Sequence, residues 1–277
     1  TEEFKSAPCT KAREDEKSKL ESPGTWELDS VREWSAVRAD PALKEATVAR
    51  LFVIMGRKGD EMVDTANPDR SLEIKYKARG VLAGNSIQSK GTPAHELFTE
   101  VAQTPASLTS ARAALAAGAL KGHRGTVRDA TTAYLQARLK THHQDGSEMP
   151  SQWVRLPRTW WPATWFNQDG TAKFYDPVVR LRKALYGHPE SEAIWDKHLG
   201  ARLKLEGWLP VSNQPGCWHH LKTGSSLVVY VDDLLMVAPP EHEEALWKGI
   251  EKHVDFSEPA LPIDRYLGAH YVMEKYK

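Results

Sequence analysis

The chain has 277 residues, in which 37 Lys plus Arg balance 37 Asp plus Glu, so the formal net charge is zero. This balance excludes a strong basic field over the whole protein, and any surface that binds phosphate must therefore be local. The two cysteines form no disulfide framework or zinc motif, which is typical of an intracellular protein. No stretch approaches the roughly 20 apolar residues of a membrane helix, and the first residues lack the apolar core of a signal peptide. We therefore expect an intracellular, non-secreted protein without membrane contact.

The first part of the chain predicts a lead-in followed by a helix. Residues 1–24 are rich in Lys, Glu, Ser and Pro and favour a flexible segment, which leaves residues 25–277 as the folded domain. Residues 40–52 combine Asp40 as a potential N-cap, Pro41 at the first helical position and apolar residues in roughly helical order. We therefore predict a helix there.

A basic segment follows. Residues 61–82 contain two strand-like runs separated by Asn67-Pro68-Asp69, which predicts a hairpin. Lys75, Lys77 and Arg79 would then share one face of a strand, because side chains alternate along it. This run is a candidate phosphate-binding surface, and a solvated basic strand is an equally common reading of it.

The second half of the chain has clearer patterns. An Ala-rich run predicts a packed helix, a short strand-like run precedes another Ala/Leu-rich stretch, an apolar stripe predicts a second helix, two β-rich runs predict a hairpin, and Pro239-Pro240 opens a third helix. These segments are, in order, residues 106–120, 127–139, 190–205, 227–238 and 242–253.

Asp232 and Asp233 are the sharpest candidates for chemistry. They interrupt the apolar runs VVYV and LLMV, and burying two unpaired carboxylates in such surroundings would be very costly. A divalent cation would offset that cost, because Mg²⁺ prefers carboxylate oxygens and keeps positions for water and phosphates. An exposed hairpin turn, where Asp is favoured, is the simpler alternative.

Five short motifs stand out along the chain. They are YKARGV at residues 76–81, RDATTAYL at residues 128–135, KALYG at residues 183–187 followed by Trp195, YVDDLL at residues 230–235, and RYLG at residues 265–268. They occur in the order found in one branch of the reverse transcriptases, and on these motifs the chain resembles the reverse transcriptase domain of Ty1/copia-type retrotransposons over residues 26–271. The YVDD element is specific, whereas the other four are individually weak.

The resemblance implies an α+β fold with a reverse-transcriptase-like palm and fingers, in which helices back an antiparallel palm sheet. It implies RNA-directed DNA synthesis from dNTPs on an RNA or DNA template-primer, in a cytoplasmic particle or the nucleus. Asp129, Asp232 and Asp233 would be the catalytic and metal-binding carboxylates for Mg²⁺ or Mn²⁺, with Asp129 and Asp232 bridging two cations about 4 Å apart. For Asp129 alone, a surface or capping aspartate would be the default interpretation.

The resemblance also implies residues for substrate binding. Tyr134 matches the aromatic position that excludes a ribose 2′-hydroxyl, and Tyr230 begins the motif beside the nucleotide. Lys77 and Arg79 match the cations that meet the triphosphate, since Lys acts as a point charge and Arg as a fork. Leu267 and Gly268, in turn, match the strand that holds the primer end.

The chain departs from the family pattern in one cationic region. His188-Pro189-Glu190-Ser191-Glu192-Ala193 stands where the family has Leu-Lys-Gln-Ala-Pro-Arg, and Ala83 replaces an arginine. Glutamates near phosphates would repel a polyanion. Two alternatives therefore stay open: a catalytically degenerate remnant that binds nucleic acid, and a two-metal nuclease. Neither an RNase H nor an integrase segment is recognisable after Tyr271, so those polyprotein activities would reside elsewhere.

Overall fold

The computed structural model describes residues 5–58, 75–99, 105–142 and 148–272. The chain divides into two compact units. Unit 1 comprises Thr1–Thr99 and Arg138–Ser191, and unit 2 comprises Glu100–Ala137 and Glu192–Lys277. Both units combine helices with mostly antiparallel sheets, which confirms the α+β class. The expected domain over residues 25–277 is thus divided between two units, and the chain passes from one unit to the other three times, after residues 99, 137 and 191.

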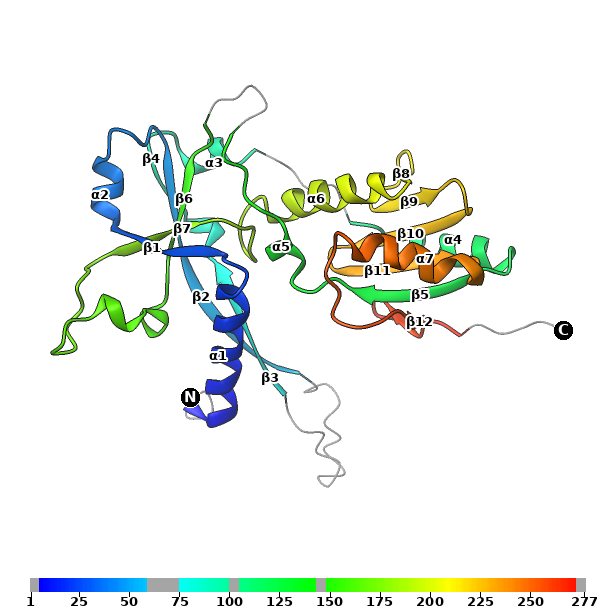
Figure 1. The fold of residues 1–277 in the computed structure, drawn as a ribbon, viewed down its shortest axis with the longest axis horizontal. Coiled ribbons are helices and arrows are strands. Elements are labelled where there is room, and N and C mark those ends of the chain that lie inside the picture. The colour runs from blue at the N-terminus through cyan, green and yellow to red at the C-terminus, as the bar shows by residue number, and fades with distance from the viewer. Residues whose placement is uncertain (1–4, 59–74, 100–104, 143–147, 273–277) are drawn as a thin grey trace. The chain divides into compact units, whose positions relative to one another are not determined.

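Unit 1 is built on a six-stranded sheet in which β7 lies between β1 and β6 (Figure 1). The β2–β6 pair is parallel and the other pairs are antiparallel. The strand order is β1 (Trp26–Glu33), β7 (Pro177–Leu181), β6 (Ser151–Arg155), β2 (Ala46–Lys58) and β3 (Lys75–Leu82), with β4 (Gln88–Lys90) also pairing with β2.

The helices of unit 1 are mostly short. In the described residues they are α1 (Ala7–Glu21), α2 (Trp34–Ala39) and α3 (Ala94–Leu97), together with the 3₁₀ turns η4 (Gly84–Ser86), η5 (Arg158–Trp160) and η6 (Ala163–Trp165). Across the described ranges, no helix is long and apolar enough to cross a bilayer.

The expectation of a flexible lead-in over residues 1–24 is wrong for most of that segment, because α1 occupies Ala7–Glu21. Cys9 and Leu20 are buried, and the Glu16 carboxylate accepts a hydrogen bond of 2.8 Å from the backbone N–H of Gly80 in β3. The composition of the segment is polar, but these few contacts with β3 provide the burial that a flexible segment lacks.

The predicted helix over residues 40–52 is also wrong. Asp40 does accept a hydrogen bond from a nearby backbone N–H, that of Ala42, but it does so in a local turn. The chain then enters β2, which pairs with three other strands. β-branched residues such as Thr47 and Val48 favour this extended conformation, and sheet pairing overrides the Asp-Pro signal for a helix start.

The second strand of the predicted hairpin over residues 61–82 is confirmed as β3. Its antiparallel partner is β2, from Leu51 opposite Leu82 to Lys58 opposite Lys75. The first predicted strand, residues 61–64, lies outside the described residues. Lys75, Lys77 and Arg79 are exposed and alternate with less exposed neighbours, as predicted for one face of a strand.

Unit 2 contains an antiparallel sheet and a separate two-stranded pair. The sheet order is β12 (Leu261–Pro262), β5 (Arg124–Asp129), β11 (Asp233–Ala238), β10 (Ser225–Tyr230), β9 (Cys217–His220) and β8 (Trp208–Pro210), and the separate pair is β13 (Arg265–Tyr266) with β14 (Ala269–His270). The hairpin predicted over residues 227–238 is therefore confirmed.

The helices predicted in the second half of the chain are confirmed as well. The Ala-rich run, the apolar stripe and the segment after Pro239 all form helices, and the Ala/Leu-rich stretch after β5 contributes only a single turn. These helices are α4 (Leu108–Ala119), α5 (Ala133–Gln136), α6 (Ser191–Leu205) and α7 (Pro240–Glu251).

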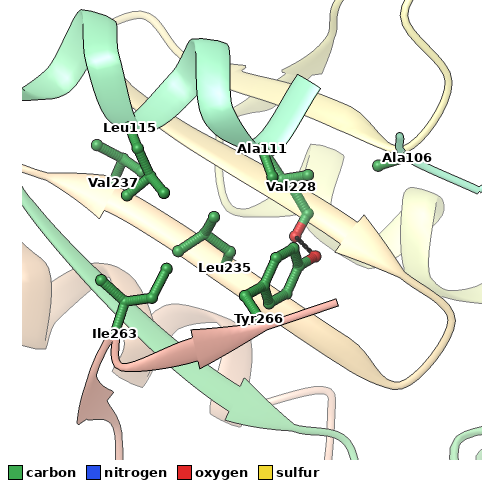
Figure 2. Close-up of a cluster of buried hydrophobic side chains, with 8 residues drawn as sticks. All are labelled: Ala106, Ala111, Leu115, Val228, Leu235, Val237, Ile263 and Tyr266. Carbon is green, nitrogen blue, oxygen red and sulfur yellow. Dashed lines mark hydrogen bonds between the residues drawn. The ribbon is translucent and has the colours of Figure 1, made fainter. Parts of the chain in front are cut away.

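The core of unit 2 lies on both faces of its sheet. Figure 2 shows Ala111 and Leu115 of α4 directed toward the strands, with Tyr266 in the same cluster. On the opposite face, Trp247 of α7 donates a hydrogen bond of 3.0 Å from its indole N–H to Thr126 of β5. Helices pack on both faces of the sheet, so the end of β5 and the beginning of β11 are held in fixed positions.

Candidate functional site

The tip of the β10–β11 hairpin carries two of the candidate acids. Tyr230 pairs with Asp233, which leaves Val231 and Asp232 as a two-residue loop. Of these two, only Val231 has a positive φ, of 55°. A positive φ at the first loop residue alone is the pattern of a type II′ turn, whose twist matches the flanking strands but which favours glycine there. The loop therefore holds a β-branched residue in a strained conformation.

Several hydrogen bonds hold this tip in place. The indole N–H of Trp195, a fully buried residue of α6, donates to the backbone oxygen of Val231 at 2.8 Å. The backbone N–H of Ala130 donates to the oxygen of Asp232, also at 2.8 Å. The Tyr266 hydroxyl donates a hydrogen bond of 3.2 Å to the backbone oxygen of Val228 (Figure 2) and one of 3.3 Å to the backbone oxygen of Asp233. Residues of α6 and β13, and the residue that follows β5, thus anchor the tip.

Asp129 meets the hairpin from the neighbouring strand. It is the last residue of β5 and lies directly opposite Asp233 in the antiparallel β5–β11 pair. Directly opposed residues of an antiparallel pair share a face of the sheet, with β-carbons about 5 Å apart. The structure therefore brings together three aspartates that are far apart in the sequence, with Asp232 at the adjoining turn.

The surroundings of Asp233 make its carboxyl harder to ionise than an isolated aspartate. Burial, then the charges of Asp232 and Asp129, and then a hydrogen bond with the Asp129 side chain raise the pKa of Asp233 to about 6. One carboxyl of a crowded cluster keeps its proton to a higher pH under these conditions. A divalent cation bound to the three carboxylates would neutralise the same repulsion, so the residues fit such an ion. Within the ranges that the structure describes, no three His, Cys, Asp or Glu side chains are already spaced as a complete set of metal ligands.

Replacing Asp233 by asparagine is expected to stabilise the metal-free protein at pH 8 and to change its stability little at pH 4. The pKa of Asp233 is about 6 when folded and 3.8 when unperturbed, so the folded state binds this proton more tightly. Stability contributed by the carboxyl is therefore present below the lower value and is lost as pH rises between the two. Thermal melting with a chelator at both pH values would measure this difference. A variant that melts below wild type at pH 8 would contradict the assignment.

The residues expected to bind the nucleotide lie in both units. In unit 2, Tyr230 is 41% exposed beside the acids, and Tyr134 is half-buried in α5, the single helical turn after β5. In unit 1, Lys77 and Arg79 are exposed on β3, and the guanidinium of Arg79 lies 5.9 Å from the centre of the Tyr186 ring.

Leu267 and Gly268 form the loop between β13 and β14. Both have positive φ, 48° and 77°, which is the pattern of a type I′ turn and accounts for the glycine. Tyr266 pairs with Ala269 on either side of the loop. Among the residues that the structure describes, none beyond the two chain neighbours lies within 4 Å of a β-carbon at position 268. The loop is therefore open to a ligand on that side.

The region that departs from the family pattern crosses from unit 1 into unit 2 after Ser191, and most of its residues are buried. The His188 ring contacts the side-chain oxygen of Gln152 and accepts a hydrogen bond of 3.1 Å from the backbone N–H of Glu190. Burial lowers the pKa of His188 to about 4, so the ring is neutral at pH 7. Glu190 is only 4% exposed, whereas Glu192 is half-buried and lines a cavity. The expected repulsion of a polyanion by these two glutamates stays a prediction.

Sequence reasoning missed two residues that position the acids. The apolar stripe predicts only core packing for Trp195, but its indole N–H also holds the hairpin turn. The sequence gives Tyr266 no role beyond its place beside the expected primer-binding pair, yet its hydroxyl lies beside the backbone of Asp233. Two of the motifs include these residues, Trp195 after KALYG and Tyr266 in RYLG. Only the fold shows which backbone oxygens their side chains reach.

A cavity of about 580 Å³ lies in unit 2 behind the same turn. Its walls include Val229, Val231, Trp218, Gly200 and Glu192. The cavity reaches the strained residue of the turn from the side of α6, next to the hydrogen bond from Trp195.

Comparisons with known proteins add no family assignment. Neither a scan against models of protein families nor a search of curated proteins finds a match to this chain.

Proposed function

We propose that this chain is the RNA-directed DNA polymerase domain of a Ty1/copia-type retrotransposon polyprotein. It would transfer nucleotides from dNTPs to a primer 3′-hydroxyl, with unit 2 as the palm and unit 1 as the fingers. The observation that supports this most strongly is the placement of Asp129 opposite Asp233 at the ends of β5 and β11, beside a two-residue turn that carries Asp232. The resemblance required this convergence of Asp129, from one motif, with Asp232 and Asp233, from another.

The chain's own residues would divide the work as follows. Asp129 and Asp232 would hold two divalent cations, Mg²⁺ or Mn²⁺, with Asp233 close by. When bound, such ions activate the primer hydroxyl and stabilise the charge that develops on the leaving pyrophosphate. Trp195 and Tyr266 would position the acids through the backbone of the hairpin, which keeps the carboxylates rigid without occupying them.

The substrate-binding residues complete the proposal. Tyr230 and Tyr134 would contact the incoming nucleotide from unit 2, and the ring of Tyr134 would exclude a ribose 2′-hydroxyl. Lys77 and Arg79 would meet the triphosphate from unit 1, where both are exposed. The open type I′ turn of Leu267 and Gly268 would lie against the primer end, where the lack of a side chain at Gly268 permits close approach of a backbone.

Primer extension tests this proposal. A labelled primer annealed to an RNA or a DNA template would be incubated with the protein, dNTPs and Mg²⁺ or Mn²⁺, with the double variant Asp232→Asn, Asp233→Asn as background. Extension above that background is expected. Binding of the primed template without extension would instead favour a degenerate remnant, and cleavage of template without dNTPs would favour a nuclease.

A further inference from the structure

One side chain connects the short helical turn α5 to a distant segment of unit 2. Gln136 is the last residue of α5, and its amide contacts the backbone of Asp255, 119 positions further along the chain. The amide N–H donates to the oxygen of Asp255 at 2.9 Å, and the amide oxygen accepts from the N–H of Asp255, also at 2.9 Å. Gln136 therefore binds both backbone groups of one residue, as a neighbouring strand would.

Thr131, just before α5, completes this contact. Its backbone N–H donates to the same oxygen of Asp255 at 2.8 Å. Its own backbone oxygen accepts a hydrogen bond of 2.7 Å from the Gln136 amide. Hydrogen bonds require a particular direction as well as a distance, so together these contacts fix the orientation of residues 131–136.

Residues 255–258, which we call the clamp segment, also contact the catalytic strand. Ala130 pairs with Phe256 in an antiparallel bridge. The backbone N–H of Ser257 donates to the backbone oxygen of Asp129 at 3.1 Å. The clamp segment thus lies along the chain from the acid at the end of β5 to the α5 turn.

Arg128 fixes the other end of the clamp segment. Its Nε donates to the backbone oxygen of Glu258 at 3.0 Å, and its guanidinium lies 4.2 Å from the centre of the Phe256 ring. The same guanidinium forms an ion pair of 2.6 Å with Glu251 at the end of α7. The clamp segment is therefore attached to β5 and α7 independently of α5, and it offers the Gln136 amide a fixed partner.

Burial alone does not set the orientation of α5. Ala133 and Leu135 are buried, but apolar burial has no preferred direction, and a helix of a single turn is not stable by itself. Thr132, which precedes the turn, has a φ of 48°, an unfavourable conformation for a β-branched residue that its neighbours must hold. The hydrogen bonds to Asp255 supply the directional contacts that the turn needs.

We propose that Gln136 is a positioning residue that sets the selectivity of the site for deoxynucleotides. Tyr134 lies two positions earlier in the same turn, and the N–H of Ala137 donates to its backbone oxygen at 3.0 Å. Loss of the Gln136 contact therefore frees the turn that carries the Tyr134 ring. The inference rests on the proposed function, in which that ring excludes a ribose 2′-hydroxyl. Such exclusion depends on where the ring lies, and displacements of about 1 Å have large effects at reacting centres.

Incorporation of one deoxynucleotide, and of the matching ribonucleotide, at a primer end tests this role. The ratio of the two kcat/KM values measures the selectivity. Gln136→Leu keeps a side chain of similar size without the hydrogen bonds and is expected to lower this ratio about tenfold. The change should come from better use of the ribonucleotide, while kcat for the deoxynucleotide changes less than about threefold. A purely structural role would lower both efficiencies alike, and an unchanged ratio would overturn the inference.

Two further variants serve as a repeat and a control. Gln136→Glu keeps an acceptor for the N–H of Asp255 but places a carboxylate against two backbone oxygens, so it should lower the ratio as Gln136→Leu does. Asp255→Asn changes an exposed side chain that takes no part in these hydrogen bonds and should keep the wild-type ratio. Equal losses of selectivity in Asp255→Asn and Gln136→Leu would overturn the role of Gln136. Thermal melting checks that each variant is folded, and Gln136→Glu alone decides if Gln136→Leu is not.

A double-mutant cycle shows whether Gln136 acts through Tyr134. Tyr134→Ala is expected to remove most of the selectivity, and Gln136→Leu added to it should lower the ratio no further. A further loss in the double variant would assign Gln136 another route of action and overturn the inference. Deoxynucleotide extension by wild type with an unchanged ratio in Gln136→Leu overturns only the role of Gln136. A wild type that incorporates neither nucleotide overturns the polymerase and this inference with it.

Discussion

Replacing Asp129 by asparagine is expected to lower the rate of primer extension by at least about 10³-fold, because stabilisation of the reaction's charge by bound cations is worth several kcal/mol. Asparagine has nearly the same shape and keeps one oxygen opposite Asp233. It cannot supply the negative charge that holds a divalent cation. The rate would be measured under single-turnover conditions on a primed template.

A matched variant separates charge at the site from charge in general. Asp264→Asn removes a carboxylate whose side chain is 88% exposed in unit 2 and is expected to leave the extension rate unchanged. Asp129→Asn is not expected to lower the melting temperature of the metal-free protein, since it removes repulsion from Asp233. Wild-type extension by Asp129→Asn would remove this residue from the active site and with it the main support for the polymerase.

The second large effect is expected in unit 1, where Gly187→Ala should destabilise the fold by more than about 4 kcal/mol. Gly187 has a φ of +81°, and a β-carbon there would overlap the backbone oxygen of Leu82. The two segments are also joined by a hydrogen bond of 2.7 Å from the N–H of Leu82 to the oxygen of Tyr186. A backbone oxygen held in this way cannot move aside as a flexible side chain would.

Gly170→Ala is the control for this effect. Gly170 has a similar φ of +80°, but a β-carbon there would meet nothing within 4 Å. It should therefore cost only the backbone penalty of a left-handed conformation, about 1 to 2 kcal/mol. Chemical denaturation followed by tryptophan fluorescence would measure both variants. Equal losses would show that the close approach of residues 82 and 187 does not matter for stability.

The sequence predicted the elements whose signals are local. The α6 stripe and the β10–β11 hairpin were recognised because apolar periodicity and turn residues lie within a few positions of one another. The two wrong predictions, α1 and β2, concern segments whose conformation depends on distant partners. Glu16 needs Gly80, and β2 needs the strands on either side of it.

The residues of the candidate site also divide into those that local sequence identifies and those that depend on distant partners. Asp232 and Asp233 could be chosen from their neighbours alone, whereas Asp129 was chosen only through a resemblance, and its position opposite Asp233 required the fold.

The strained turn at Val231 has a consequence for how the chain can change. A glycine there would relieve the unfavourable φ of 55° and would release about 1 kcal/mol, so selection for stability alone would replace valine. Glycine would also widen the range of backbone dihedral angles at position 231, between Tyr230 and Asp232. The side chains of both residues would then occupy a wider range of orientations. Valine at this position therefore lowers the stability of the fold but narrows the range of positions that the carboxylates occupy. Variants of this turn with a lower melting temperature should hold their carboxylates in the narrower range.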